Sequence, residues 1–215
     1  MDGNNAPAFT AAGDVVVASF GQHTVHVLAA TTGAGVHTCG AQGSAPLQFE
    51  YPCGVCVSHA DTIIVADCVN DRLQEVAHLG RGPATLLAAG LVQGPRAVAL
   101  TPTEDALVVR QQGGANRVLV LTRDGSAIVR VLLTTADVAY GYFGLAVSRS
   151  GVVAVPVFSK QQVVVVSVDG AWKRSIDAAV LGSPLGNVYG AAFDSREQIW
   201  TCDFNAKCFV VIAPK

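Results

Sequence analysis

The chain has 215 residues, of which 51% are hydrophobic and 14% are charged, so it can bury a substantial core and does not have a disordered composition. The net charge of −2 and the absence of a basic block argue against nucleic-acid binding. The sequence has no run of roughly 18 apolar residues for a membrane span, and its N-terminus does not resemble a signal peptide. We therefore expect a soluble, cytoplasmic protein without a membrane partner.

Short valine-rich runs recur along the chain and predict an all-β fold. Aligned on their most regular strand, five units begin near residues 14, 62, 106, 151 and 198, which gives a period of about 45 residues. This period is typical of one four-stranded blade of a β-propeller. We expect a single domain over residues 1–215, with blade units at about 7–40, 49–90, 95–135, 143–178 and 189–215.

The outermost strand of each unit is the least regular. We place the fourth strands near residues 35–39, 84–88, 128–133 and 173–176, and the fifth unit lacks one. The five visible blades either close a ring or form an open arc of an incomplete six-bladed propeller. An open arc would expose apolar blade faces and unpaired edges, and these would favour self-association.

The second unit, Phe49 to Val76, has the clearest motif and resembles an NHL repeat. The matching positions that define the structural motif are Phe49, Pro52, Gly54, Asp67, Asn70 and Arg72. The resemblance implies a β-propeller, commonly six-bladed and related to gluconolactonase, regucalcin and amidating-lyase propellers. We expect Arg72 to pair with Asp67. The third unit departs from the motif, with Arg110-Gln111 where the repeat has Ala-Asp.

The resemblance also implies that ligands bind on the face formed by the loops between second and third strands and by the segments that precede the first strands. Candidate binding residues on this face are Tyr51, Arg72, Arg96, Arg117, Tyr142, Lys160, Asn187 and Tyr189. Aromatic and arginine side chains dominate the energetics of many interfaces. Our leading hypothesis is a non-catalytic scaffold that binds a protein or peptide and needs no cofactor.

An enzyme is the alternative from another class. A hydrolase or lyase of the gluconolactonase-like type would hold calcium or zinc in the central channel through carboxylate and amide oxygens. The candidate ligands are Glu50, Asp137, Asn187 and Asp194, which form no recognisable motif. RNA binding is a third option, and it would need a contiguous basic stripe involving Arg72, Arg96, Arg117 and Lys160.

The six cysteines contain one CxxC spacing, at Cys53 and Cys56. Zinc binding and redox exchange both use this spacing, but residues three apart on a strand point to opposite faces, so we favour a structural role. Cys202 and Cys208 flank a turn and can face each other across a hairpin, although a reducing cytosol disfavours a disulfide.

Overall fold

The computed structural model describes residues 7–138, 144–182 and 185–213. Two four-stranded antiparallel sheets come first along the chain: blade 1 (β1-β2-β3-β4) and blade 2 (β7-β8-β9-β10). Their strands are, in order, Ala8–Phe9, Val15–Ser19, Thr24–Leu28, Gly35–Cys39, Pro52–Val57, Ile63–Asp67, Arg72–Val76 and Ala84–Leu87. Between them, β5 (Ala41–Gln42) and β6 (Gln48–Phe49) form a short parallel pair.

Three further antiparallel sheets follow: blade 3 (β11-β12-β13-β14), blade 4 (β15-β16-β17-β18) and blade 5 (β19-β20-β21). Their strands are, in order, Pro95–Leu100, Ala106–Gln111, Arg117–Thr122, Ile128–Leu133, Ala146–Val147, Val152–Val157, Gln162–Ser167, Lys173–Ile176, Val188–Phe193, Ile199–Asp203 and Cys208–Ile212. The helical elements are η1 (His78–Gly80), η2 (Phe158–Lys160) and α1 (Ala178–Leu181). No helix in the described ranges is long and apolar enough to cross a membrane.

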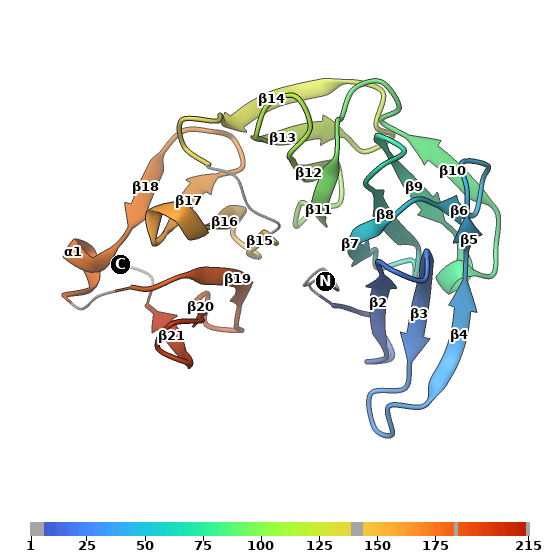
Figure 1. The fold of residues 1–215 in the computed structure, drawn as a ribbon, viewed down its shortest axis with the longest axis horizontal. Coiled ribbons are helices and arrows are strands. Elements are labelled where there is room, and N and C mark those ends of the chain that lie inside the picture. The colour runs from blue at the N-terminus through green and yellow to red at the C-terminus, as the bar shows by residue number, and fades with distance from the viewer. Residues whose placement is uncertain (1–6, 139–143, 183–184, 214–215) are drawn as a thin grey trace.

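The five sheets lie around a common axis as the blades of a β-propeller (Figure 1). The predicted all-β fold is confirmed, and the predicted fourth strands at 35–39, 128–133 and 173–176 match β4, β14 and β18. Blade 5 has three strands among the described residues, so the prediction that it lacks its outer strand is also confirmed. The arrangement has five blades, and the described part of the chain supplies no sixth blade, since the only further sheet there is the short β5-β6 pair.

The hydrophobic core is divided into four clusters, and each cluster lies between two neighbouring blades. Phe49 and Val65 belong to the cluster between blades 1 and 2, and Leu107 to the one between blades 2 and 3. Val155 lies between blades 3 and 4, and Val188 between blades 4 and 5. Burial between stacked sheets explains why the middle strands are apolar on both faces and show no alternating pattern.

Blades 1 and 5 are the two ends of an open arc (Figure 1). Every residue of β8 in blade 2 is buried, whereas β2 in blade 1 alternates between buried and half-buried residues. In blade 5, Trp200 and Phe209 remain 41% and 75% exposed. None of the four core clusters of described residues joins blade 5 to blade 1. The end blades therefore bury one face each, which is the arrangement expected of an open arc.

Acidic side chains tie neighbouring blades together in the turns between first and second strands. Asp61 accepts a hydrogen bond from the Ala11 N–H (3.3 Å), and Glu104 accepts one from the His59 N–H (2.7 Å). Glu197 accepts one from the Ser150 hydroxyl (2.7 Å). Each acid reaches back to the preceding blade, 45 to 50 residues earlier in the chain. These contacts reinforce the packing at one end of the propeller.

The exposed apolar face of blade 5 leads to a prediction about association. We expect a second copy of this chain to cover Trp200, Phe209 and Val211, because their exposed fractions of 41%, 75% and 43% are high for an apolar sheet face. Light scattering should show a mass that rises with concentration, and the double change Phe209→Glu and Val211→Lys should abolish the rise.

The matched control for this prediction changes the outer strand of blade 3. Val129 and Val131 are also 57% and 44% exposed, but they lie on β14, at the periphery of an internal blade. The double change Val129→Glu and Val131→Lys should leave the association unchanged. A monomeric mass at every concentration of the unmodified chain would contradict the prediction.

Candidate functional site

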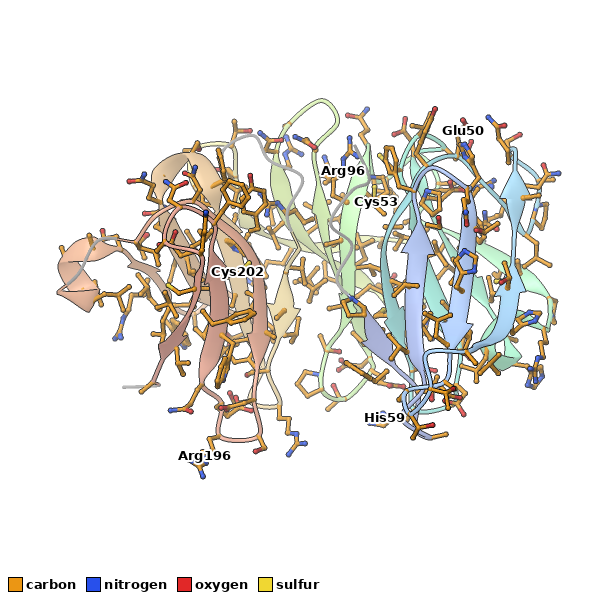
Figure 2. The ribbon with its side chains drawn as sticks, turned by 60° about the horizontal axis from the view of Figure 1, so that its bottom comes forward. Glu50, Cys53, His59, Arg96, Arg196 and Cys202 are labelled. Atoms are coloured by element: carbon orange, nitrogen blue, oxygen red, sulfur yellow. The ribbon has the colours of Figure 1, made fainter. Side chains whose placement is uncertain are left out.

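The side chains with binding chemistry gather at one end of the propeller, where second strands end and first strands begin. We refer to this end as the loop face. Figure 2 shows Glu50, Cys53 and Arg96 at this end, and His59 and Arg196 at the opposite end. Because the strands within each blade are antiparallel, alternate connections along the chain return to the same end. Residues from distant parts of the sequence therefore meet on the loop face.

A buried carboxylate at the end of β8 organises the loop face of blade 2. Asp67 is fully buried and accepts hydrogen bonds from the Glu50 N–H (2.7 Å), Asn70 Nδ2 (2.9 Å), Arg72 Nε (2.8 Å) and Gln74 Nε2 (3.0 Å). Four donors compensate the cost of removing this charge from water. The predicted pairing of Arg72 with Asp67 is confirmed.

Arg72 extends this network into the segment that leads to β7. Its guanidinium donates to the carbonyl oxygens of Ser44 (2.5 Å), Ala45 (3.1 Å) and Gln48 (3.0 Å). Arg72 is 6% exposed, so it holds its own chain and does not reach the surface where we expected a binding residue. It also cannot contribute to a surface stripe for RNA. Its role is structural, because its hydrogen bonds fix the loop.

The same arrangement recurs in other blades with different side chains. The last residue of the second strand accepts the backbone N–H that lies two residues before the first strand. Gln111 accepts the Gln93 N–H (3.3 Å), and Asp203 accepts the Gly186 N–H (2.6 Å). Gln111 therefore takes the role of the missing motif aspartate in the third unit. This recurrence explains why the third unit keeps the blade geometry although its sequence differs from the repeat motif.

Asp203 shows the electrostatic consequence of this arrangement. The backbone N–H groups of Ala206 and Gly186 donate to its carboxylate and hold the pKa of Asp203 below its ordinary value. The ionised form therefore stabilises the folded chain above that ordinary value. This contribution is lost as the pH falls through the lowered pKa.

Turn residues between second and third strands connect neighbouring blades at the loop face. His23 Nδ1 accepts the Tyr51 N–H (3.2 Å), and Asp71 Oδ1 accepts the Gly94 N–H (2.7 Å). Both residues have a positive φ, of 58° and 53°, and each holds the segment that leads into the next blade. Histidine and aspartate tolerate this left-handed conformation better than most side chains do. The loop face is therefore fixed by contacts between blades.

Two aromatic clusters lie on the loop face. In the first, the Tyr51 ring lies 4.6 Å from both the Phe20 and His23 rings, measured between centroids. In the second, the Tyr189 ring lies 5.2 Å from Phe158 and 5.4 Å from Phe204. Such distances are typical of aromatic pairs that contribute more than their buried area. The predicted residues Tyr51 and Tyr189 are thus each part of a cluster.

Sequence reasoning missed the phenylalanines of these clusters. Phe20, Phe158 and Phe204 each directly follow the second strand of their blade, so the same position carries phenylalanine in three of five units. Comparison of the aligned units would have revealed this signal. Phe204 is 66% exposed, which is high for its size. The second cluster (Phe158, Tyr189 and Phe204) therefore combines two half-buried rings with one strongly exposed ring at the loop face.

The remaining predicted binding residues lie in different environments. Arg96, on β11, is half-buried and its Nη1 donates to Cys53 Sγ (3.4 Å). Arg117 and Lys160 are exposed, and Lys160 Nζ donates to the Ala136 carbonyl oxygen. Asn187 Nδ2 donates to Asn205 Oδ1 (3.2 Å). Tyr142 lies outside the described residues.

The candidate metal ligands do not come together. Asp137 pairs with Lys173 Nζ (2.5 Å) and accepts the Thr134 N–H (3.0 Å). Asp194 caps the β19–β20 turn, where it accepts hydrogen bonds from the Arg196 N–H (2.8 Å) and Trp200 Nε1 (3.0 Å). Arg196 of this turn lies at the end of the propeller opposite Glu50 (Figure 2). Glu50 and Asn187 remain on the loop face. Within the described ranges, no group of three or more His, Cys, Asp and Glu side chains could hold a metal ion.

The cysteines are arranged differently from the predictions made from their spacing. All six are free thiols. In β7, Cys53 and Gly54 oppose a single residue of β8, and this bulge breaks the alternation, so Cys53 and Cys56 both face blade 3. In blade 5, Cys202 pairs with Phe209 and Cys208 with Asp203. The idea that Cys202 and Cys208 face each other is therefore wrong, because this register directs them to opposite faces.

Comparisons with known proteins identify the fold and leave the function open. No protein-family model matches the chain, and no curated protein matches its sequence, so the NHL label stays a resemblance. A gluconolactonase from Xanthomonas campestris is 18% identical with a TM-score of 0.74, covering 97% of this chain and 71% of that one.

Two further solved structures illustrate how widely this fold is shared. A chain of a nidogen–laminin complex is 13% identical with a TM-score of 0.73, covering 97% of this chain and 79% of that one. Virginiamycin B lyase from Staphylococcus aureus is 9% identical with a TM-score of 0.66, covering 99% and 70%. At these identities the similarity shows a shared β-propeller fold, and function has to be argued from the site.

Proposed function

We propose that this propeller is a binding module that holds a protein or peptide segment on its loop face. The observation that carries the proposal is the cluster of Phe158, Tyr189 and Phe204, in which Phe204 is 66% exposed. Clustered aromatic side chains that keep exposed surface are typical anchors of protein interfaces. Hydrogen bonds within and between blades hold the surrounding loops, so little conformational entropy would be lost on binding.

The charge around the cluster indicates the chemistry of the ligand. Lys160 follows Phe158 by two residues and Lys207 follows Phe204 by three, and both lysines are exposed. Arg96 contributes a third positive charge at the loop face. We therefore propose a segment that combines apolar or aromatic side chains with one or more carboxylates. Such a ligand would bury its apolar part on the cluster and place its charges near the lysines.

A library of random 12-residue peptides displayed on phage, selected against the immobilised full chain, tests the proposal. We expect enrichment of sequences with an aromatic or aliphatic residue next to Asp or Glu. Phe204→Ala should weaken binding of a selected peptide about ten-fold or more, the loss typical of an interface anchor. The matched control is Arg196→Ala, at the opposite end of the propeller, which should leave affinity unchanged.

Two outcomes would overturn the binding module. One is the absence of enrichment over an unrelated immobilised protein, and the other is an equal loss of affinity in both variants.

The alternative of a metal-dependent hydrolase or lyase makes a separate prediction. One equivalent of calcium or zinc in the purified chain by elemental analysis, with hydrolysis of a lactone, would favour that alternative.

A further inference from the structure

Blade 5 has an open strand edge where each of the other blades has a fourth strand. In blades 1 to 4 the third strand pairs with a fourth, whereas β21, the third strand of blade 5, has no such partner among the described residues. The sequence of β21 is CFVVI, which contains neither a charged residue nor a proline. Charged residues and prolines are the usual devices that keep an edge strand from pairing with another chain. The edge of β21 can therefore accept an additional strand.

The other four blades show which side chain such a strand should bring. In each of them the last residue of the fourth strand is buried and apolar, and it pairs with the second residue of the third strand. The pairs are Cys39 with Val25, Leu87 with Leu73, Leu133 with Val118 and Ile176 with Val163. The second residue of β21 is Phe209, which is 75% exposed. An aliphatic side chain opposite Phe209 would remove part of this ring from water.

The turn between third and fourth strands packs against the preceding blade at the three junctions before blade 5. The contacts are the Gly80 carbonyl oxygen with His37 Nε2 (3.1 Å), Arg123 with Glu75, and Gly170, where a Cβ would lie 3.1 Å from the Arg130 Cδ. The junction between blades 4 and 5 has no such turn within the described ranges. The outer part of this junction is therefore uncovered.

A pocket of about 370 Å³ lies at this uncovered junction. Buried residues of both blades form its floor, among them Ile176 of β18 and Ile212 of β21. The pocket lies at the C-terminal end of β21, where Ile212 and Ala213 line it. A strand that runs antiparallel to β21 would begin over the pocket and end beside Phe209. One segment can therefore fill the pocket and pair with the strand edge.

The pocket also presents a cation. Arg174 lines it, is exposed, and forms none of the ion pairs found among the described residues. Arg174 occupies the position in blade 4 that Arg130 has in blade 3, because each pairs with the fourth residue of its third strand. The turn that packs on Arg130 contains Asp169. Hydrogen bonds from the Ser167 hydroxyl and the Ala171 N–H, together with the charge of Arg130, lower the pKa of Asp169. An acidic residue in the added segment would complement Arg174 in the same way.

We propose that β21 accepts an extended segment of another protein chain as the fourth strand of blade 5. The segment runs antiparallel to β21 and begins with an acidic residue beside Arg174. It places an aliphatic residue opposite Phe209 seven positions later, the spacing of Asp169 and Ile176 in blade 4. Backbone hydrogen bonds along the edge supply affinity, and these two side chains supply specificity. The site is separate from the aromatic cluster on the loop face.

A synthetic peptide with the sequence of residues 168–177 is the probe, because it carries an acid and an aliphatic residue at this spacing. Hydrogen–deuterium exchange of the full chain, with and without the peptide, locates the contact. We expect slower exchange in β21 and unchanged exchange in η2 on the loop face. A fluorescein-labelled peptide gives the affinity by fluorescence anisotropy, and the change Ile176→Asp in the peptide should weaken binding about ten-fold.

Two comparisons separate strand addition from nonspecific apolar contact. Two peptides N-methylated at alternate residues lose either the N–H groups that face β21 or those that face solvent, so only one of them should bind. The change Arg174→Glu in the full chain should weaken binding of the unmodified peptide about three-fold, and Asp169→Lys in the peptide should recover this loss.

Three results would overturn the proposal. The first is the absence of binding at millimolar peptide, and the second is slower exchange in β14 or β18 in place of β21. The third is equal binding of the two N-methylated peptides. Phe204→Ala, which tests the loop face, should leave the affinity for this peptide unchanged. Failure of strand addition and failure of the loop-face proposal are therefore distinguishable.

Discussion

The variant Asp67→Ala is expected to lower the free energy of unfolding by about 3–5 kcal/mol, the usual cost of removing one partner from a buried ion pair. Its carboxylate accepts hydrogen bonds from four groups, and the change would leave the cation of Arg72, which is 6% exposed, without its acidic partner. For a chain of this length, the loss corresponds to a fall in Tm of about 10 °C. Urea unfolding and thermal melts followed by circular dichroism measure it.

Asp203→Ala is the matched control for this change. Asp203 ends the second strand of blade 5 as Asp67 does in blade 2, but its carboxylate accepts hydrogen bonds from the backbone N–H groups of Gly186 and Ala206. Because Asp203→Ala leaves no buried cation without its partner, it should lower the free energy of unfolding by only about 1–3 kcal/mol. If both variants lost the same stability, the buried ion pair would not be the source of the larger effect.

Gly54→Ala is expected to destabilise the chain by about 2 kcal/mol, although alanine normally suits a strand better than glycine does. A Cβ at Gly54 would lie 2.7 Å from the Ala97 Cα and 2.9 Å from the Arg96 carbonyl oxygen. These are backbone atoms of β11, so they cannot move aside as a flexible side chain can. The first strands of blades 2 and 3 would have to separate, which should lower Tm by about 4–8 °C.

Gly35→Ala provides the control in a strand without this crowding. Gly35 begins β4, the outer strand of blade 1, and a Cβ there would meet no atom within 4 Å. Its φ is not positive, so alanine should be neutral or stabilising by about 0.4–1 kcal/mol. Equal losses in the two variants would contradict the close approach of blades at Gly54, whereas a loss in Gly54→Ala alone would support it.

The strands were predictable because their signals are local. The runs 63–67 and 162–166 contain the β-branched and apolar residues that strands prefer, and the structure places β8 and β17 there. Asn70-Asp71 supplied a turn signal between two such runs. Repetition at about 45 residues then indicated the blade, because each unit has to bury its faces against its neighbours.

The candidate site was predictable only in part. Tyr51 and Tyr189 follow from the position of the segments that precede the first strands, but their ring partners Phe20, Phe158 and Phe204 come from other loops. The burial of Arg72 required the loop carbonyls that lie 24 to 28 residues earlier in the chain. Such contacts depend on how the loops fold back over the blade, and no local sequence pattern predicts that loop conformation.

By itself, the sequence determined the all-β class, the five repeated units and the Asp67–Arg72 pair, because these follow from residue preferences and from spacings within one unit. The tertiary structure decided that the blades form an open arc, and that Cys53 meets Arg96 of the next blade. A one-residue bulge or register shift reverses which face a side chain occupies, so partners across strands and blades are fixed only once the sheets are assembled.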